Sequence, residues 1–411
     1  MKAKFYLTAL SCFIMIFVKA QNEGIHFENE GDWKSVVSKA KAENKYIFVD
    51  CYTTWCGPCR AMEQNVYPQK EVGDFFNEKF INVKFQLDTT NHDADQIKRR
   101  YKDAAYINKE YKINAYPTYL FFSPDGELVH VEVGGGLPQE FITKASNALN
   151  PQSQYYTQIK KYENGNRDAA FLKNLTVLAI HAYDLQAASK YAKEYYATQK
   201  DLLSKDNLEF VYRTTFNVSD TGFTLMMHNL SKFETVIDPQ RLHSDLVMII
   251  IQSELQTINA NWSEKEWTDF ENDLLRKYPD YGEEVLVQIK TNHFRGKSSW
   301  KNYSKAVTRY MSTKYPSVSS LNEFAWTVFL QCNDKEVLED ALMWSKKSFT
   351  DQSKVEPGYI DTYANLLYKL GRNKEALEWE MKAQDIAIEQ GADKSWGQDV
   401  IDKINKGEKT W

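Results

Sequence analysis

The first 150 residues alternate between two patterns of hydrophobic and polar positions. Short continuous apolar runs predict buried strands, and segments whose apolar residues recur every three or four positions predict helices. The expected strands are 25–27, 46–52, 81–87, 119–122 and 128–133. Helices are expected after Asp32, from near Pro58, through Val72–Phe76, and over Asp93–Lys112 and Pro138–Leu149. Strands alternating with helices, with a final hairpin turn at 124–126, predict an α/β domain.

From about Tyr155 onward the chain reads as all-helical. The clearest segment is Tyr359–Ile386, where small residues (Ala364, Gly371, Ala376, Ala383) lie among large apolar ones. This resembles a tetratricopeptide-like helical hairpin, because small residues let two antiparallel helices approach closely. Segments 324–349 and 174–195 show weaker versions of the pattern. We expect domains at 21–150 and 151–411, joined near Asn150–Ser153, the second being a helical-repeat-like array or a plain helical bundle.

The first twenty residues have the pattern of a secretory signal peptide. Lys2 and Lys4 precede an apolar run over Phe5–Val18, and Val18-Lys19-Ala20 places small or branched residues at the cleavage offsets. A spanning helix needs about 20 apolar residues, so this run is too short to cross a bilayer. We expect cleavage near Ala20 and export to a periplasm or the exterior.

Composition and charge exclude several classes of function. Hydrophobic residues make up 43% of the 411 and aromatics 14%, which is typical of a folded protein. The formal net charge is −5, so the chain lacks the basic excess that a nucleic-acid partner requires. Beyond Cys56 and Cys59 no Cys or His pair stands at metal-ligand spacing, so neither a metal nor another cofactor is expected. Cys51 and Cys332 are interpreted as buried thiols.

The strongest chemical motif is Trp55-Cys56-Gly57-Pro58-Cys59, which comes directly after a predicted strand and opens a predicted helix. Two cysteines at this spacing can form a small disulfide that opens readily. Unpaired N–H groups and the helix dipole favour a thiolate at Cys56, lowering its pKa from about 8.5 toward about 7. Cys56 is therefore the predicted nucleophile, with its sulfur exposed.

Cys59 is the predicted resolving cysteine, which attacks the mixed disulfide and releases the partner. Asp50 lies in an apolar strand, where a buried carboxyl is costly unless it is used, and a base for the Cys59 proton is such a use. Lys84, in the strand 81–87, is either the partner of Asp50 or a lysine at a sheet edge whose head group reaches solvent.

Residues 25–149 resemble the thioredoxin superfamily. The likeness rests on Phe48-Val49-Asp50 before the motif, Tyr116-Pro117-Thr118 before the next strand, Asp125-Gly126 in the hairpin, and Gly134 after the last strand. It implies a mixed central sheet flanked by helices, a cis bond at Pro117 facing the cysteines, a lysine neighbour for Asp50 at Lys84, and main-chain pairing of substrate at Tyr116. The residues expected to contact substrate are Trp55, Gly57, Pro58, Tyr116, Pro117 and Gly134.

Together these features predict an exported thiol-disulfide oxidoreductase that reduces protein disulfides. Its redox group is the Cys56/Cys59 pair, and its partners are disulfide-bearing proteins and an electron donor protein. The Gly57-Pro58 pair resembles reducing members of the superfamily, while an oxidase or isomerase direction stays open. The alternative is a helical binding or scaffold protein in which the thioredoxin-like part serves only for docking.

Overall fold

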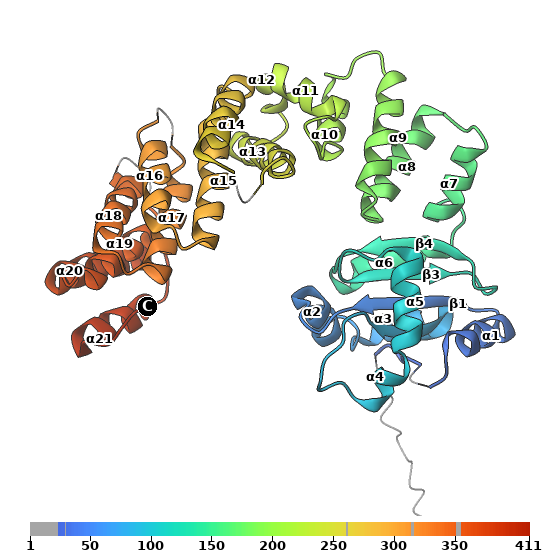
Figure 1. The fold of residues 1–411 in the computed structure, drawn as a ribbon. Coiled ribbons are helices and arrows are strands. Elements are labelled where there is room, and N and C mark those ends of the chain that lie inside the picture. The colour runs from blue at the N-terminus through green and yellow to red at the C-terminus, as the bar shows by residue number, and fades with distance from the viewer. Residues whose placement is uncertain (1–23, 29, 260–261, 314–315, 351–354) are drawn as a thin grey trace, which may run out of the picture. The chain divides into compact units, whose positions relative to one another are not determined.

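The computed structural model describes residues 24–28, 30–259, 262–313, 316–350 and 355–411 (Figure 1). The predicted signal peptide at 1–20 lies outside these residues. The chain forms two compact units, Met1–Thr215 and Phe216–Trp411. Within the described residues, no helix is both long and apolar enough to cross a membrane.

A four-stranded mixed sheet is the centre of the first unit. The strand order is β2-β1-β3-β4, in which β1 and β2 are parallel and the other neighbours are antiparallel. This confirms the predicted mixed sheet. The strands are β1 (Tyr46–Tyr52), β2 (Phe80–Gln86), β3 (Thr118–Phe122) and β4 (Leu128–Val133).

Helices cover both faces of this sheet, because successive side chains of a strand point to opposite faces. Phe121 belongs to an aromatic core with Phe76 of α3 and Phe141 of α6. Its neighbour Phe122 meets Trp33 of α1 at 4.9 Å and Tyr111 of α5 at 5.4 Å between ring centroids. The first six helices are α1 (Trp33–Glu43), α2 (Gly57–Asn65), α3 (Lys70–Lys79), α4 (Asp95–Arg99), α5 (Tyr101–Tyr111) and α6 (Pro138–Ala148).

Two predicted elements differ from the structure. The expected edge strand at 25–27 is reduced to a single parallel bridge between Phe27 and Asn82. The expected helix over 93–112 is divided at Arg100 (φ −95°, ψ 0°), which ends α4 and precedes α5.

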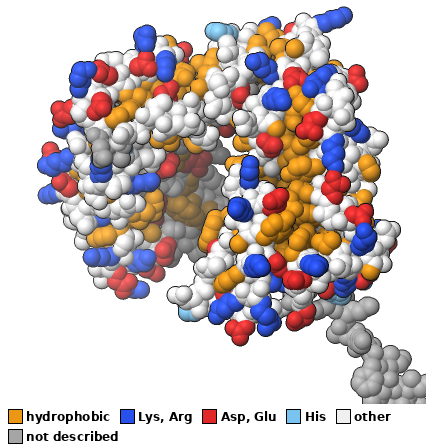
Figure 2. All heavy atoms as spheres, turned by 45° about the vertical axis from the view of Figure 1, so that its right-hand side comes forward, with side chains coloured by type: hydrophobic (Ala, Val, Ile, Leu, Met, Phe, Trp, Pro, Cys, Tyr) orange, Lys and Arg blue, Asp and Glu red, His pale blue; other side chains and the backbone are white. Residues whose placement is uncertain are grey.

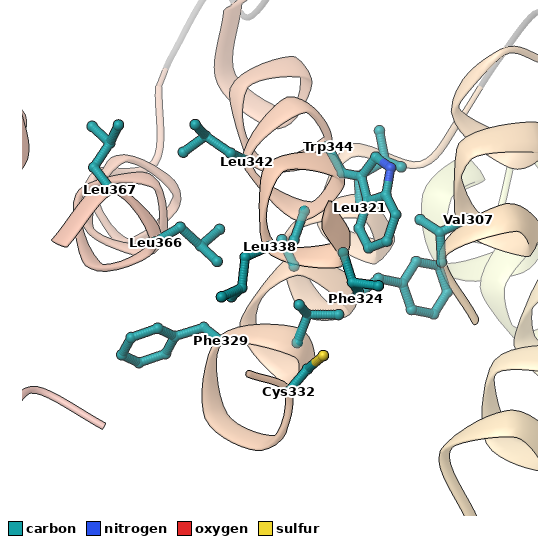
Figure 3. Packing of buried hydrophobic residues seen from close by; sticks show 14 of the residues in the cluster. Val307, Leu321, Phe324, Phe329, Cys332, Leu338, Leu342, Trp344, Leu366 and Leu367 are labelled. Carbon is teal, nitrogen blue, oxygen red and sulfur yellow. The ribbon is translucent and has the colours of Figure 1, made fainter. Parts of the chain in front are cut away.

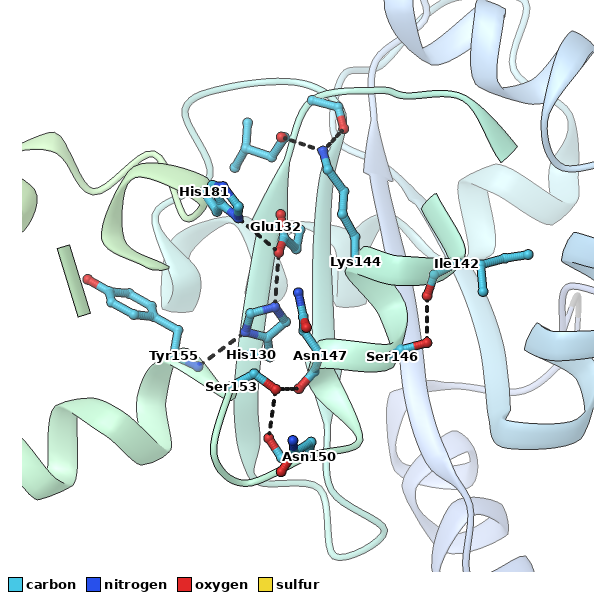
Figure 4. A network of polar contacts seen from close by, with 12 residues as sticks. His130, Glu132, Ile142, Lys144, Ser146, Asn147, Asn150, Ser153, Tyr155 and His181 are labelled. Atoms are coloured by element: carbon cyan, nitrogen blue, oxygen red, sulfur yellow. Dashed lines mark hydrogen bonds and ion pairs between the residues drawn. The ribbon is translucent and has the colours of Figure 1, made fainter. Parts of the chain in front are cut away.

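Further helices pack onto the edge of the sheet at β4: α7 (Tyr155–Glu163) and α8 (Ala169–His181). Figure 4 shows the polar network at this junction. His130 of β4 accepts a hydrogen bond from the Tyr155 N–H at 3.1 Å, and Glu132 lies 3.2 Å from the His130 ring and 3.5 Å from that of His181. The unit continues through α9 (Leu185–Ala197) and α10 (Lys205–Arg213). The domain boundary expected near residue 150 stays a prediction.

The second unit is helical in its described residues. One of its cores gathers Leu321, Phe324, Leu338 and the fully buried Trp344 from neighbouring helices (Figure 3). The helices are α11 (Thr221–His228), α12 (Leu230–Phe233), α13 (Pro239–Leu255), α14 (Glu264–Lys277), α15 (Gly282–Gly296), α16 (Trp300–Met311), α17 (Val318–Gln331), α18 (Lys335–Thr350), α19 (Pro357–Lys369), α20 (Asn373–Glu389) and α21 (Gln398–Lys406).

The predicted hairpin at 359–386 corresponds to α19 and α20. Ala364 and Ala376 are fully buried between large side chains, and Gly371 takes a φ of +82° in the turn between the helices. Glycine adopts this left-handed conformation without the steric cost that a Cβ brings. The hairpin thus forms where small residues permit it, while membership of a tetratricopeptide-like repeat family stays a prediction.

Candidate active site

Cys56 and Cys59 are joined by a disulfide at the start of α2, directly after β1, with their Cα atoms 5.4 Å apart. Cys56 is 3% exposed and Cys59 6%. The prediction of an exposed Cys56 sulfur is therefore wrong for this oxidised state, because the bond to Cys59 holds that sulfur against the first turn of the helix.

The position of Cys56 is nevertheless suited to carry negative charge. It is the N-cap of α2, and its Sγ accepts a hydrogen bond from the Cys59 N–H at 3.0 Å. Gly57 and Pro58 follow as the first two helical residues, and a Cβ on Gly57 would meet nothing within 4 Å. On reduction, the same N–H and the helix dipole stabilise a thiolate at Cys56.

Asp50 lies near the middle of β1 and is 2% exposed. Burial raises the pKa of this carboxyl from 3.8 to about 6, against the opposing effects of the Lys84 charge and the Tyr67 hydroxyl. Its Oδ1 atom has no hydrogen-bond partner. A carboxyl in this state can accept a proton near neutral pH and has a free oxygen with which to do so.

Lys84 does not form the expected direct ion pair with Asp50. The two residues are register partners in parallel strands, yet the Lys84 Nζ lies 2.7 Å from Glu63 Oε1 and 4.8 Å from the centre of the Tyr52 ring. The reason is solvation, since Glu63 is 59% exposed and its pairing leaves the ammonium near water, whereas Asp50 is buried. The positive charge still lowers the pKa of Asp50 from a distance.

Glu63 was missed by the sequence reasoning. A usable signal was present, because Glu63 lies four residues after Cys59 and so shares its face of α2. Met62, on the same helix, was also missed: its Sδ accepts a hydrogen bond from the Gly136 N–H at 3.4 Å. Met62 thus connects the cysteine helix to the loop that follows β4.

Three predicted substrate-contact residues lie around the proline loop. The Tyr116–Pro117 bond is cis, as the resemblance implies, and the Pro117 carbonyl accepts a hydrogen bond from the Gly134 N–H at 2.9 Å. Gly134 has a φ of +87° and open space where a Cβ would point. Trp55 is 66% exposed and meets Tyr116 edge to face, with ring centroids 5.5 Å apart. An aromatic pair, exposed at Trp55 and half-buried at Tyr116, therefore lies between the cysteine motif and the proline loop.

The other two cysteines among the described residues lie apart from this chemistry. Cys51 is on β1 beside Asp50 but points to the opposite face, and Cys332 is in the second unit. Both are free and buried, and burial raises the pKa of each thiol. In the part of the chain that the structure describes, no group of three or more His, Cys, Asp or Glu is arranged to hold a metal ion.

Comparison with known proteins locates the family in this part of the chain. Residues 33–150 match the family described as thioredoxin-like domain. Thioredoxin H7 of Arabidopsis thaliana is 35% identical over 121 residues, which cover 29% of this chain and 78% of that protein. Thioredoxin-2 of Pyricularia oryzae is 32% identical over 111 residues (27% and 52%), and the thiol:disulfide interchange protein DsbD of Pseudoalteromonas atlantica is 25% identical over 126 residues (31% and 19%).

The chain thus spans about half of the Pyricularia thioredoxin and a fifth of DsbD. The matched region contains both cysteines, the buried acid and the cis-proline. Through this region the chain belongs to the thioredoxin-like family of thiol-disulfide oxidoreductases.

Proposed function

We propose that this chain is an exported oxidoreductase that reduces disulfides in other proteins through the Cys56/Cys59 dithiol. The observation that carries the proposal is the disulfide at the start of α2, together with the buried Asp50 and its pKa of about 6. A scaffold has no physical use for a costly buried acid next to a dithiol helix.

The reaction proceeds in two exchanges. The Cys56 thiolate attacks one sulfur of the substrate disulfide; a Cys56–substrate bond forms, the substrate bond breaks, and the first substrate thiolate leaves and takes a proton from water. Cys59 then attacks Cys56 as its own proton passes to the Asp50 carboxylate. The Cys56–Cys59 bond forms and the second substrate thiolate leaves. Two electrons have passed to the substrate, and a donor dithiol must restore the reduced pair.

The surroundings of the cysteines have supporting roles in this proposal. Trp55, Gly57, Pro58, Tyr116, Pro117 and Gly134 form the surface that receives the substrate. Lys84, paired with Glu63, supplies positive charge that keeps the pKa of Asp50 from rising further. The helical region from residue 151 onward recruits or positions a protein partner.

Export is part of the proposal and rests on the N-terminal sequence. Lys2, Lys4 and the apolar run up to Val18 have the order of a signal peptide. Amino-terminal sequencing of protein recovered from outside the cytoplasm of the producing cell should begin at Gln21. A mature chain that retains Met1 would contradict export by cleavage.

The direction of electron flow is tested by the reduction potential of the Cys56/Cys59 couple. The full mature chain is equilibrated in glutathione or dithiothreitol buffers, and the reduced fraction is counted by alkylation and mass spectrometry. A potential near or below about −230 mV, the range of thioredoxins and glutaredoxins, is expected for a reductase. A value near about −120 mV would make the protein a disulfide donor and would contradict the proposed direction.

A further inference from the structure

A cavity of about 620 Å³ lies within the first unit, between the sheet and the helices that follow the family match. Its apolar wall is formed by Leu120 of β3 with Val131 and Val133 of β4. The other walls come from the end of α5, the start of α7 and the turn between α8 and α9. Clefts of this size hold ligands as large as one or two bulky side chains. Figure 2 shows hydrophobic side chains gathered in a band on the face that comes forward in that view.

Four tyrosines line the cavity, Tyr111, Tyr155, Tyr156 and Tyr183, together with the charged residues Lys112 and Asp184. Burial raises the pKa of the Tyr111 and Tyr155 phenols, so these rings stay neutral at physiological pH. Neutral phenol rings over an aliphatic wall present an amphipathic surface, which suits another aromatic side chain better than a charged group.

Two residues of the lining adopt a backbone conformation that normally favours glycine. Among the described residues, four other than glycine have a left-handed φ, and two of these, Lys112 and Tyr183, line this one cavity. The φ of Tyr183 is +57°, and its side chain is left 50% exposed. Both residues end a helix, α5 and α8, where a left-handed residue commonly closes the last turn.

The polar network of Figure 4 fixes the walls in place. His130 holds the first residue of α7 through the Tyr155 N–H, and Glu132 holds His181, the last residue of α8. The Tyr155 hydroxyl donates to Asp184 Oδ2 at 2.9 Å, which ties α7 to the turn that carries Tyr183. The cavity is therefore held by hydrogen bonds from three elements and is not a gap between loosely packed helices.

The lining is continuous with the active-site loop. Asn114 and Thr118 both line the cavity, and they lie on either side of the Tyr116–Pro117 bond. An extended polypeptide advances about 3.3 Å per residue, so a segment held at this loop can place a side chain in the cavity within a few residues.

We propose that this tyrosine-lined cavity binds an aromatic side chain of the polypeptide whose disulfide is exchanged at Cys56. The site makes the enzyme selective for protein substrates that carry an aromatic residue near the disulfide. This inference rests on the proposed function, because it assigns a substrate feature to the same reaction.

The test compares a protein disulfide with a small one, using the full mature chain. Insulin, whose B chain is rich in aromatic residues, and 2-hydroxyethyl disulfide are reduced with dithiothreitol as the electron source. Tyr183→Ala and Tyr111→Ala should each raise the KM for insulin about five- to tenfold and leave its kcat unchanged, since an aromatic contact of about 1 kcal/mol corresponds to a factor of this order. Turnover of 2-hydroxyethyl disulfide should not change.

The matched control is Met248→Ala, which removes an equally exposed side chain (50%) in the second unit and should alter neither substrate. An unchanged insulin KM in both tyrosine variants would overturn the proposal. A parallel loss with both disulfides would also overturn it, because the tyrosines would then act on the redox centre.

A binding measurement separates this inference from the proposed function. Insulin B chain with both cysteines alkylated cannot undergo exchange, so its binding to the oxidised protein, measured by calorimetry, reports docking alone. Binding by the wild-type chain that weakens about five- to tenfold in Tyr183→Ala supports the cavity even if no disulfide is turned over. Equal binding by both chains, or no binding by either, contradicts it.

Discussion

Replacing the buried acid, Asp50→Asn, should stabilise the thioredoxin-like part of the chain at alkaline pH. The wild-type carboxyl has a pKa of about 6 in the folded protein against 3.8 in its ordinary state, because burial penalises the ionised form. Each unit of pKa corresponds to about 1.4 kcal/mol, so ionisation of Asp50 costs the folded state about 3 kcal/mol at pH 8. Asparagine has a similar shape and carries no charge.

The pH dependence follows from the direction of the shift. A carboxyl whose pKa is raised by folding makes its full contribution to stability below pH 3.8 and loses it as the pH rises through about 6. The advantage of the asparagine variant should therefore be about 3 kcal/mol at pH 8, about half of that at pH 5, and close to zero at pH 3.

Hydrogen exchange followed by mass spectrometry measures this gain locally. The opening free energy of peptides that span β1 and β3 is compared between wild type and variant at pH 5 and pH 8, with both proteins in the disulfide form. Local measurement is needed because eight of the ten tryptophans lie beyond residue 150 and would dominate a fluorescence signal.

The control is Glu63→Gln, which neutralises a carboxyl that is 59% exposed and should change stability by less than about 1 kcal/mol at either pH. An Asp50→Asn variant with no gain at pH 8, or with the same gain at both pH values, would refute the assignment of a raised pKa. If Asp50 also accepts the Cys59 proton, the stabilised variant should release the second substrate thiol more slowly than wild type.

Three further variants test other parts of the structure. Cys59→Ser should leave the first exchange intact and accumulate a mixed disulfide on Cys56, which mass spectrometry detects as an added mass that dithiothreitol removes. If a Cys56→Ser variant instead accumulates a mixed disulfide on Cys59, the assigned roles of the two cysteines are reversed. Glu132→Gln should speed hydrogen exchange in α7 above pH 4.5. Burial raises the pKa of Glu132, but the contacts from His130 and His181 outweigh it and lower that pKa to about 2. Unchanged exchange would show that the Glu132 charge does not hold the helix. Glu380→Gln should slow hydrogen exchange in α19 and α20 at pH 8 but not at pH 4, since burial raises the pKa of Glu380 well above 4.5. Slower exchange at both pH values would contradict a raised pKa.

The strands and the redox motif were predictable because their signals are local. The apolar run at 46–52 is β1 without a change of boundary, and Pro58 lies in the first turn of α2, where its missing N–H is tolerated. The Lys84 pairing was not predictable in the same way, because strand register alone places Lys84 beside Asp50. Lys84 pairs with Glu63 because that carboxylate stays in contact with water, and tertiary packing determines which carboxylate does so.

The burial of β4 is a second feature that its own sequence does not predict. Its sequence, Leu-Val-His-Val-Glu-Val, alternates apolar and polar residues, which is typical of a strand with one face in water. In the structure His130 and Glu132 are both 0% exposed, because α6 lies against β4 and α7 and α8 close the edge of the sheet there. His130 finds a partner in the Tyr155 N–H of α7 and Glu132 Oε1 finds one in His181 of α8, which offsets part of the cost of burial, whereas Glu132 Oε2 has no hydrogen-bond partner.

This covering of β4 bears on where the thioredoxin-like part ends. The segment 150–153 has the composition of a linker, yet Ser153 donates to the Asn147 carbonyl at 3.0 Å and the buried Gln154 donates to that of Ala148 at 2.8 Å. These two hydrogen bonds fix the connection as a turn that directs α7 back onto the sheet. A chain cut at residue 150 would keep the cysteines, Asp50 and the cis-proline, but it would lose the Tyr155 N–H that donates to His130 and three of the four tyrosines around the cavity. The family match therefore contains the groups that carry out the exchange, whereas the proposed choice of substrate requires the helices beyond it.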